Sequence, residues 1–303
     1  MSTPYPVQEG TIPFRGYETW YRMVGAAEKP GKLPLLCLHG GPGVPHEYLE
    51  SLEAMAATGR RVIFYDQLGC GNSTHVDDPA LWTVELFVEE VDVVRRALGL
   101  ERLHILGQSW GGMLTMQYML TQPQGVASIT IASSPSSMSM WLAEANRLRG
   151  ELPAEVQATL TAHEAAGTTD SAEYLAAMQV FYDRYVCRVV PNPPYVQRAF
   201  AKLGEWPQVY HTMNGPSEFH VIGVIKDWDV TARLGEINAP ALVTSGRYDE
   251  ATPWIAETVH KGIRGSEWVV FEESAHLAHA EEPERYMAVL ADFLARVEGG
   301  NNG

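Results

Sequence analysis

The sequence has little cysteine, and its three cysteines, Cys37, Cys70 and Cys187, are widely spaced. An odd and sparse set does not form the disulfide framework of a small secreted domain. No C-x-x-C pair is present to hold zinc, and we expect neither a metal nor an organic cofactor. The expected location is therefore a reducing compartment, the cytoplasm.

Positive charge is also scarce, since 22 Lys and Arg stand against 37 Asp and Glu in 303 residues, a formal net charge of −15. Proteins that bind nucleic acid neutralise phosphates with Lys and Arg, and no basic run occurs here. We therefore expect no nucleic-acid partner and no binding to anionic membrane surfaces. The excess of acid is interpreted as an aid to solubility.

Long hydrophobic runs are absent, because no apolar stretch reaches the length of about 20 residues that crosses a membrane. Residues 1–6 lack the basic and apolar regions of a secretory signal. These absences favour a soluble protein, and the 46% of hydrophobic residues favours a large buried core.

Short apolar runs that alternate with helical patterns are what the sequence does contain. The segment 84–98 is the clearest helix, with Thr83 as a predicted N-cap and Gly99 as a stop. Residues 7–25 predict a hairpin at a sheet edge. Alternating strands and helices indicate an α/β fold with a mostly parallel central sheet flanked by helices. The predicted buried strands are 33–38, 61–66, 103–106, 127–133, 239–246 and 267–271, and the other predicted helices are 47–57, the segment ending at Leu120, and 283–297.

The alternation stops after about residue 135 and returns at residue 239. Residues 138–228 are rich in Ala, Glu and aromatic residues, are mostly helix-like, and are broken by prolines at 153, 191, 193 and 194. We therefore predict a catalytic domain made of residues 1–137 and 229–303. A helical cap domain, residues 138–228, is inserted into it.

A G-x-S-x-G sequence, Gly107-Gln-Ser109-Trp-Gly111, lies between a predicted strand and a predicted helix. In that context it is typical of a nucleophile elbow, where a strained turn presents a serine and small neighbours let other backbone come close. The simpler interpretation is a glycine-rich turn with a surface serine. The flanking strand and helix favour Ser109 as a nucleophile.

A serine nucleophile needs a base, and the base needs an acid that orients it. On this kind of sheet the acid and then the histidine follow the serine, each after a late strand. Asp249 follows the strand that ends at about residue 246, and His276 follows the strand 267–271. Alone, each would be a helix-capping aspartate or an ordinary loop histidine. Their order and placement favour a triad, with His279 as the second choice for the base.

Acyl transfer to a serine also needs hydrogen-bond donors that stabilise the oxyanion. One predicted donor is the backbone N–H of Trp110, directly after the nucleophile. The other is predicted in the glycine-rich loop 39–43, which follows the first parallel strand. Gly/Pro turns are common in proteins. The position of this turn, directly after the first parallel strand, favours the oxyanion role.

Five motifs in this order resemble the proline iminopeptidase family of α/β hydrolases, which includes the tricorn-interacting aminopeptidase and L-amino-acid amidases. The resemblance implies an α/β-hydrolase fold with an inserted helical cap. It also implies a serine enzyme that releases an N-terminal residue, often proline, from short peptides or amides. The motifs are His39-Gly-Gly-Pro-Gly43, Asp66-Gln-Leu-Gly-Cys-Gly71, Gly107-Gln-Ser-Trp-Gly-Gly112, Gly246-Arg-Tyr-Asp-Glu250 and Ser274-Ala-His276.

The resemblance further implies that Glu218 and Glu250 bind the free ammonium of the substrate and that Gly41 is the loop oxyanion donor. A buried ammonium needs paired negative charge, because its desolvation is otherwise prohibitive. Two carboxylates would also reject substrates whose N-terminus is blocked. From the residues alone, a solvated cap residue is an equal alternative for Glu218, and an acid ahead of the helix that begins near Pro253 is an alternative for Glu250.

Other functions stay open from the sequence alone. An L-amino-acid amidase or esterase would use the same machinery, and a non-catalytic receptor on the same fold is a more distant alternative. A dehalogenase or epoxide hydrolase of this fold would carry a nucleophilic aspartate, and position 109 is serine. The preferred first residue and the oligomeric state are not predicted. Trp110 is a candidate for a proline pocket, whereas the cap aromatics are left unassigned: Trp141, Phe181, Tyr185, Trp206, Tyr210 and Phe219.

Overall fold

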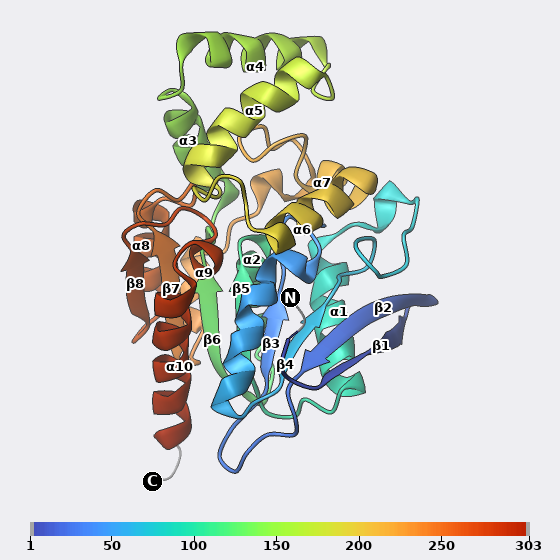
Figure 1. Ribbon diagram of the computed structural model, residues 1–303, viewed down its shortest axis with the longest axis vertical. Coiled ribbons are helices and arrows are strands. Elements are labelled where there is room, and N and C mark those ends of the chain that lie inside the picture. Colours follow the sequence, from blue (N-terminus) through green and yellow to red (C-terminus); the bar gives the residue numbers. More distant parts are fainter. Residues whose placement is uncertain (1–2, 301–303) are drawn as a thin grey trace.

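An eight-stranded sheet runs through the centre of the molecule in the computed structural model, which describes residues 3–300 (Figure 1). The spatial order is β1-β2-β4-β3-β5-β6-β7-β8. The first three strands pair antiparallel, and every later pairing is parallel. The predicted mostly parallel sheet with an edge hairpin is confirmed. The strands are β1 (Val7–Phe14), β2 (Tyr17–Val24), β3 (Leu35–Leu38), β4 (Val62–Tyr65), β5 (Leu103–Gln108), β6 (Val126–Ala132), β7 (Ala241–Gly246) and β8 (Glu267–Phe271).

Successive residues of the central strands point to opposite faces, so the sheet has a hydrophobic core on each side. Leu36 and Ile63 belong to the core covered by α1 (Val84–Ala97), α2 (Trp110–Met119) and α8 (Pro253–Gly262). Leu35 and Phe64 belong to the core covered by α10 (Pro283–Gly299) and the 3₁₀ helix η1 (His46–Thr58). Burial on both faces explains why these strands are continuous apolar runs.

Helix α1 forms where its sequence predicts a helix. The hydroxyl of Thr83 accepts a hydrogen bond from the N–H of Leu86 at 3.2 Å, which caps the first turn. Phe87, Val91 and Val94 are fully buried on one face. Each such side chain contributes roughly 1.5–3 kcal/mol to folding.

The segment predicted as a helix at 47–57 is helical, and its type is the 3₁₀ helix η1. Its buried residues Leu49, Leu52 and Met55 are spaced by three, which aligns them on one side of a helix with three residues per turn. Gly59, in the left-handed region with φ 85°, ends the helix. This spacing of the buried residues, rather than helix propensity, accounts for the 3₁₀ winding of the segment.

Helices fill the chain between β6 and β7 and form a cap over one end of the sheet (Figure 1). Below, "cap" refers to α3 through α7. The residue limits 138–228 of a separate cap domain stay a prediction. Within residues 3–300, no helix combines the length and apolarity needed to cross a membrane. The cap helices are α3 (Met138–Arg149), α4 (Ala154–Ala166), α5 (Ala172–Tyr185), α6 (Pro194–Glu205) and α7 (Gln208–Met213), followed by η3 (Val224–Asp227) and η4 (Thr231–Glu236).

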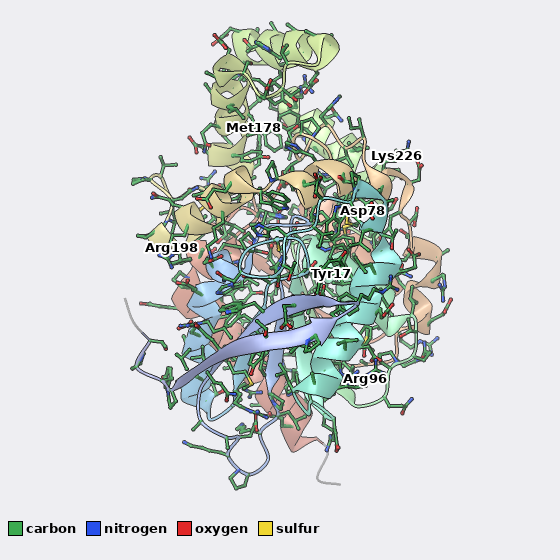
Figure 2. The ribbon with its side chains drawn as sticks, turned by 90° about the vertical axis from the view of Figure 1, so that its right-hand side faces the viewer. Tyr17, Asp78, Arg96, Met178, Arg198 and Lys226 are labelled. Carbon is green, nitrogen blue, oxygen red and sulfur yellow. The ribbon has the colours of Figure 1, made fainter. Side chains whose placement is uncertain are left out.

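Helix α6 attaches the cap to the sheet domain. Val196 and Ala199 are buried against η1. Arg198, labelled in Figure 2, pairs with Glu50 at 2.5 Å, and Lys202 pairs with Glu47. Apolar burial and charge pairing therefore fix α6 of the cap against η1 of the sheet domain.

Candidate active site

Ser109 occupies a sharp turn between β5 and α2. Its backbone has φ 56° and ψ −124°, a conformation that is strained for a residue with a side chain. The turn brings neighbouring backbone very close, so position 111 must be glycine. A Cβ there would stand 2.1 Å from the carbonyl oxygen of Leu38. The geometry is that of a nucleophile elbow.

His276 and Asp249 are joined by a short hydrogen bond. Nδ1 of His276 lies 2.7 Å from Oδ1 of Asp249, and both side chains are almost fully buried. The aspartate is held in turn by the N–H groups of Ala251 at 2.8 Å and Gly246 at 3.3 Å. Asp249 follows β7 and His276 follows β8, and His276 lines one cavity with Ser109. The fold thus brings the three predicted residues to one end of the sheet.

His279, the second choice for the base, does not line that cavity. It is buried between the rings of Tyr48 and Tyr286, and its Nδ1 lies 3.0 Å from the hydroxyl of Ser51. Burial and the neighbouring His276 lower the pKa of His279 to about 3. These contacts favour His276 over His279 as the base.

The predicted oxyanion donors lie around Ser109. Gly41 and Trp110 line a small cavity together with Ser109. The loop before Gly41 is fixed by a chain of hydrogen bonds in which the N–H of Gly40 donates to the hydroxyl of Tyr48 at 2.6 Å. Tyr48 donates to Oε1 of Gln108 at 2.7 Å, and Nε2 of Gln108 donates to the carbonyl of His276 at 3.1 Å. Sequence reasoning missed Tyr48 and Gln108.

Glu250 lies beside the histidine without a partner of its own. Its Oε1 is 3.8 Å from Nε2 of His276, and neither of its buried oxygens has a hydrogen-bond partner among the described residues. Burial raises the pKa of the Glu250 carboxyl well above its ordinary value, and the charges of Glu218 and Asp249 raise it further. In the empty site the pKa of this carboxyl therefore favours its neutral form, and a nearby positive charge would favour the carboxylate.

Glu218, from the segment after α7, faces the same cavity as Glu250. The hydroxyl of Tyr210 donates to its Oε1 at 2.6 Å, and the indole N–H of Trp141 donates to its backbone carbonyl at 2.7 Å. Burial raises the pKa of Glu218 against the opposing effects of the Tyr210 hydroxyl and of His276. Two carboxylates therefore meet at one wall of the cavity, where no Lys or Arg of residues 3–300 lines the space.

The cap supplies two backbone acceptors to the catalytic loops. The carbonyl of Tyr185, at the end of α5, accepts from the N–H of Glu250 at 3.2 Å. The next carbonyl, that of Val186, accepts from the N–H of His276 at 3.1 Å. The end of α5 therefore fixes both loops at once.

Comparison with known proteins agrees with this geometry. Residues 34–283 match the family described as the alpha/beta hydrolase fold. The chain is 40% identical to a proline iminopeptidase of Lactobacillus helveticus over 94% of this chain and 97% of that protein. It is 37% identical to one of Saccharolobus solfataricus over 96% and 93%. The chain belongs to the proline iminopeptidase family of α/β hydrolases.

Two solved structures are also similar to this family member. The proline iminopeptidase of Mycobacterium smegmatis has 46% identity and a TM-score of 0.90, with 97% of this chain and all of the other covered. The crystal structure of VinJ has 45% identity and a TM-score of 0.93, with 96% and 99% covered. Both matches extend through the cap as well as the sheet.

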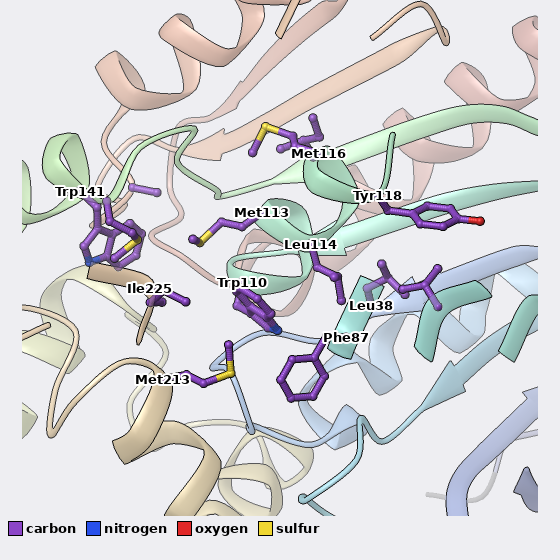
Figure 3. Close-up of a cluster of buried hydrophobic side chains, with 14 of the residues drawn as sticks. Leu38, Phe87, Trp110, Met113, Leu114, Met116, Tyr118, Trp141, Met213 and Ile225 are labelled. Carbon is purple, nitrogen blue, oxygen red and sulfur yellow. The ribbon is translucent and has the colours of Figure 1, made fainter. Parts of the chain in front are cut away.

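Beside Ser109, this family member also has a small apolar pocket, and the ring of Trp141 in its lining has its centroid 5.7 Å from that of His276. Figure 3 shows Trp110, Met113, Trp141 and Ile225, four of its lining residues. The Trp110 indole also extends into the core, where its N–H donates to Gln67 at 2.9 Å. Of the cap aromatics, Trp141 lines this pocket and Tyr210 holds Glu218. The others pack elsewhere: Phe181 against Tyr185 and Phe219, and Trp206 against His75.

His46, Glu47 and Asp66 form the cluster that most resembles a metal site, with ligand atoms within 4.8 Å of one another. Most of their polar atoms already have partners among the described residues, although Oε2 of Glu47 has none. Nδ1 of His46 lies 2.7 Å from Oδ1 of Asp66, whose other oxygen accepts two bonds from Asn72, and Lys202 pairs with Glu47. We interpret the cluster as a buried ion-pair network beneath α6.

Proposed function

We propose that this chain is a serine aminopeptidase that releases an N-terminal proline from short peptides or amides. One observation carries the proposal: the carboxylates of Glu218 and Glu250 face a cavity beside His276, and no cation of the described residues faces them. Burial of a carboxylate without a charge partner is costly, so a fold that keeps Glu250 unpaired beside Glu218 is adapted to receive a positive charge. A free N-terminal ammonium supplies that charge.

In the proposed reaction Ser109 attacks the carbonyl carbon of the first residue while His276 removes the hydroxyl proton. The N–H groups of Gly41 and Trp110 stabilise the oxyanion of the tetrahedral intermediate. His276 then gives its proton to the leaving amine, and the C–N bond breaks to leave an acyl-serine. Water, deprotonated by His276, hydrolyses this ester and restores Ser109. Asp249 holds the ring in the tautomer that makes both transfers possible.

The apolar pocket beside Ser109 supports the preference for proline. Met113, Trp141 and Ile225 offer apolar surface to a ring, and Glu218 lies at the same pocket. A pyrrolidine has its nitrogen within its ring, so the ring and the ammonium must be bound close together. We further propose that the enzyme works in the cytoplasm, since its three buried cysteines are all free.

The test compares proline p-nitroanilide with its N-acetyl derivative, using the wild type and Ser109→Ala. The proposal expects release of nitroaniline from the free-amine substrate by the wild type alone. Equal cleavage of both substrates would contradict the ammonium site and indicate a general amidase or esterase. Undiminished cleavage by Ser109→Ala would contradict the nucleophile. Faster cleavage of other amino-acid anilides would contradict the preference for proline.

A further inference from the structure

The cap contains a second, larger cavity that the proposed reaction has not used. It has a volume of about 430 Å³, within the range of small-molecule sites, and lies between α5, α6 and α7. Met178, labelled in Figure 2, is on its wall. We call this cavity the cap chamber. Its apolar lining includes Leu175, Met178, Val186, Phe200, Leu203 and Pro207.

The cap chamber continues from the catalytic cavity. Tyr182, Val186, Phe200 and Glu218 line both spaces. The small pocket beside Trp110 and Met113, by contrast, shares only Glu218 with the cap chamber. Ser109 therefore borders two spaces, the small pocket and the catalytic cavity that continues into the cap chamber.

The position of His276 assigns the two sides. The histidine must protonate the leaving amine. The leaving amine therefore lies in the cavity that His276 lines. His276 lines the cavity that opens into the cap chamber and is absent from the small pocket. The side chain of the acyl residue consequently lies in the small pocket, its ammonium reaches Glu218 and Glu250 where the two spaces meet at Ser109, and the cap chamber receives the group attached to the leaving nitrogen.

The charges around the cap chamber restrict what that group is. No Lys or Arg of residues 3–300 lines the chamber, and its one carboxylate is Glu218. The leaving part of a short peptide carries a terminal carboxylate, which would find polar groups such as Gln179, Asn192 and Gln197 but no Lys or Arg in this lining, and would be repelled by Glu218 and Glu250. An uncharged apolar amine meets neither cost and gains from contact with the lining.

We infer that the preferred substrates are prolyl amides of extended, uncharged apolar amines, with the apolar chain bound in the cap chamber. This inference rests on the proposed aminopeptidase reaction and narrows its leaving group. It makes amides, rather than short peptides with a free carboxylate, the better substrates.

The experiment compares three prolyl amides that share the same acyl group: the methylamide, the octylamide, and the amide of aminooctanoic acid. The octylamide is expected to exceed the methylamide in kcat/KM by at least about tenfold, since each buried methylene contributes about 0.8 kcal/mol. The terminal carboxylate is expected to remove most of that gain. Equal rates for methylamide and octylamide, or for octylamide and its carboxylated analogue, would overturn the inference while the proposed function stands.

Two variants locate the effect. Gly204, on α6, lines the chamber and has open space at its Cβ position, so Gly204→Phe narrows the chamber and should lower octylamide turnover but not methylamide turnover. Gly235→Phe is the matched control, at an exposed glycine with equal space outside the chamber. Leu175→Arg, at a side chain already 46% exposed, should restore turnover of the carboxylated amide.

A measurement without turnover separates the two proposals. Calorimetry with Ser109→Ala should give tighter binding of prolyl octylamide than of the methylamide even if hydrolysis fails. Absence of hydrolysis of all three amides by the wild type would contradict the proposed function. Equal affinities of octylamide and methylamide for Ser109→Ala would contradict the cap chamber as their site.

Discussion

Nε2 of His276, the nitrogen that would accept the proton of Ser109, lies 3.8 Å from Oε1 of Glu250. Asp249, the preceding residue, binds Nδ1 on the other side of the same ring. Two consecutive acids therefore flank one imidazole, one of them fully hydrogen-bonded and the other without a partner. Only the unpartnered acid has a free charge to offer a substrate.

Replacement of this acid, Glu250→Gln, is expected to separate binding from stability. Loss of a charged hydrogen bond to the substrate ammonium should lower kcat/KM for proline p-nitroanilide by roughly 10- to 100-fold. The free energy of unfolding should rise by about 1–3 kcal/mol at neutral pH, because glutamine removes the cost of burying this group as a carboxylate or of protonating it there. Enzyme kinetics and denaturant titration measure the two effects.

Glu281→Gln is the matched control. Glu281 is a half-buried acid whose pKa is also raised by burial, but it accepts backbone N–H bonds from Arg188, Ala275 and Leu277. Its replacement should lower, not raise, the free energy of unfolding. A loss of stability in Glu250→Gln comparable to that in Glu281→Gln would argue against an uncompensated carboxylate at position 250.

The pH dependence of kcat/KM should report the two site glutamates. Burial raises the pKa values of Glu218 and Glu250, so both bind protons at a pH where an ordinary glutamate is still ionised. As the pH falls, ammonium binding should weaken before the usual range of glutamate titration is reached. Kinetics across the acid limb should show a KM increase in the wild type and a shallower one in Glu250→Gln. A KM that stays constant there would contradict the assignment.

Tyr48→Phe should lower kcat by about tenfold or more while KM changes little. The substitution leaves the N–H of Gly40 and Oε1 of Gln108 without their shared partner, at a cost of about 1–3 kcal/mol for each buried group. The loop that positions the oxyanion donor then loosens. Tyr286→Phe, at an equally buried tyrosine whose hydroxyl lies 3.4 Å from Thr244, is the control and should keep its kcat. A similar kcat loss in both variants would indicate a general packing effect.

Gly111→Ala should unfold more easily and lose activity. The added Cβ would overlap the carbonyls of Leu38 and His39, which are backbone atoms and cannot rotate away. Overpacking of this kind costs about 1–3 kcal/mol. Gly235→Ala, where the added atom meets nothing within 4 Å, is the control in thermal and kinetic assays. Wild-type activity in Gly111→Ala would show that the turn has more room than its geometry implies.

Glu90 should make stability decline as the pH rises. Burial raises the pKa of this carboxyl to about 8, whereas an unfolded glutamate titrates at about 4.3. Between these values the folded state holds the proton that the unfolded state has lost, so raising the pH favours unfolding, by up to a few kcal/mol. Denaturant midpoints of the wild type relative to Glu90→Gln, from about pH 5 to 8, should show the decline. Parallel curves would contradict it.

The sequence predicted those parts of the site that depend on order along the chain. Ser109, Asp249 and His276 each follow a strand of a parallel sheet, and the carboxyl ends of such strands meet at one edge. The bond between Tyr48 and Gln108 was out of reach, because 60 residues separate them and the motif around Gln108 leaves its own position variable. The carbonyls of Tyr185 and Val186 carry no side-chain signature at all, so no pattern could have marked them.

The same distinction applies to the secondary structure. Helix α1 was predictable because Thr83, its apolar face and Gly99 all indicate the same element. Segment 47–57 was predicted as a helix without its type, since the three-residue spacing of Leu49, Leu52 and Met55 gains meaning only against the sheet. Local signals decide that a helix forms, and tertiary packing decides how tightly it winds.

The bonds from the end of α5 to Glu250 and His276 have a consequence for exchanging caps between relatives. A graft that replaces α5 beyond residue 184 also replaces the two carbonyls that set the backbone of the base and of an acid beside it. Chimeras whose donor segment ends before Tyr185 would combine the donor's cap helices with this protein's own backbone contacts to Glu250 and His276. Chimeras whose donor segment extends through Val186 would take both of these backbone contacts from the donor, along with the donor's specificity.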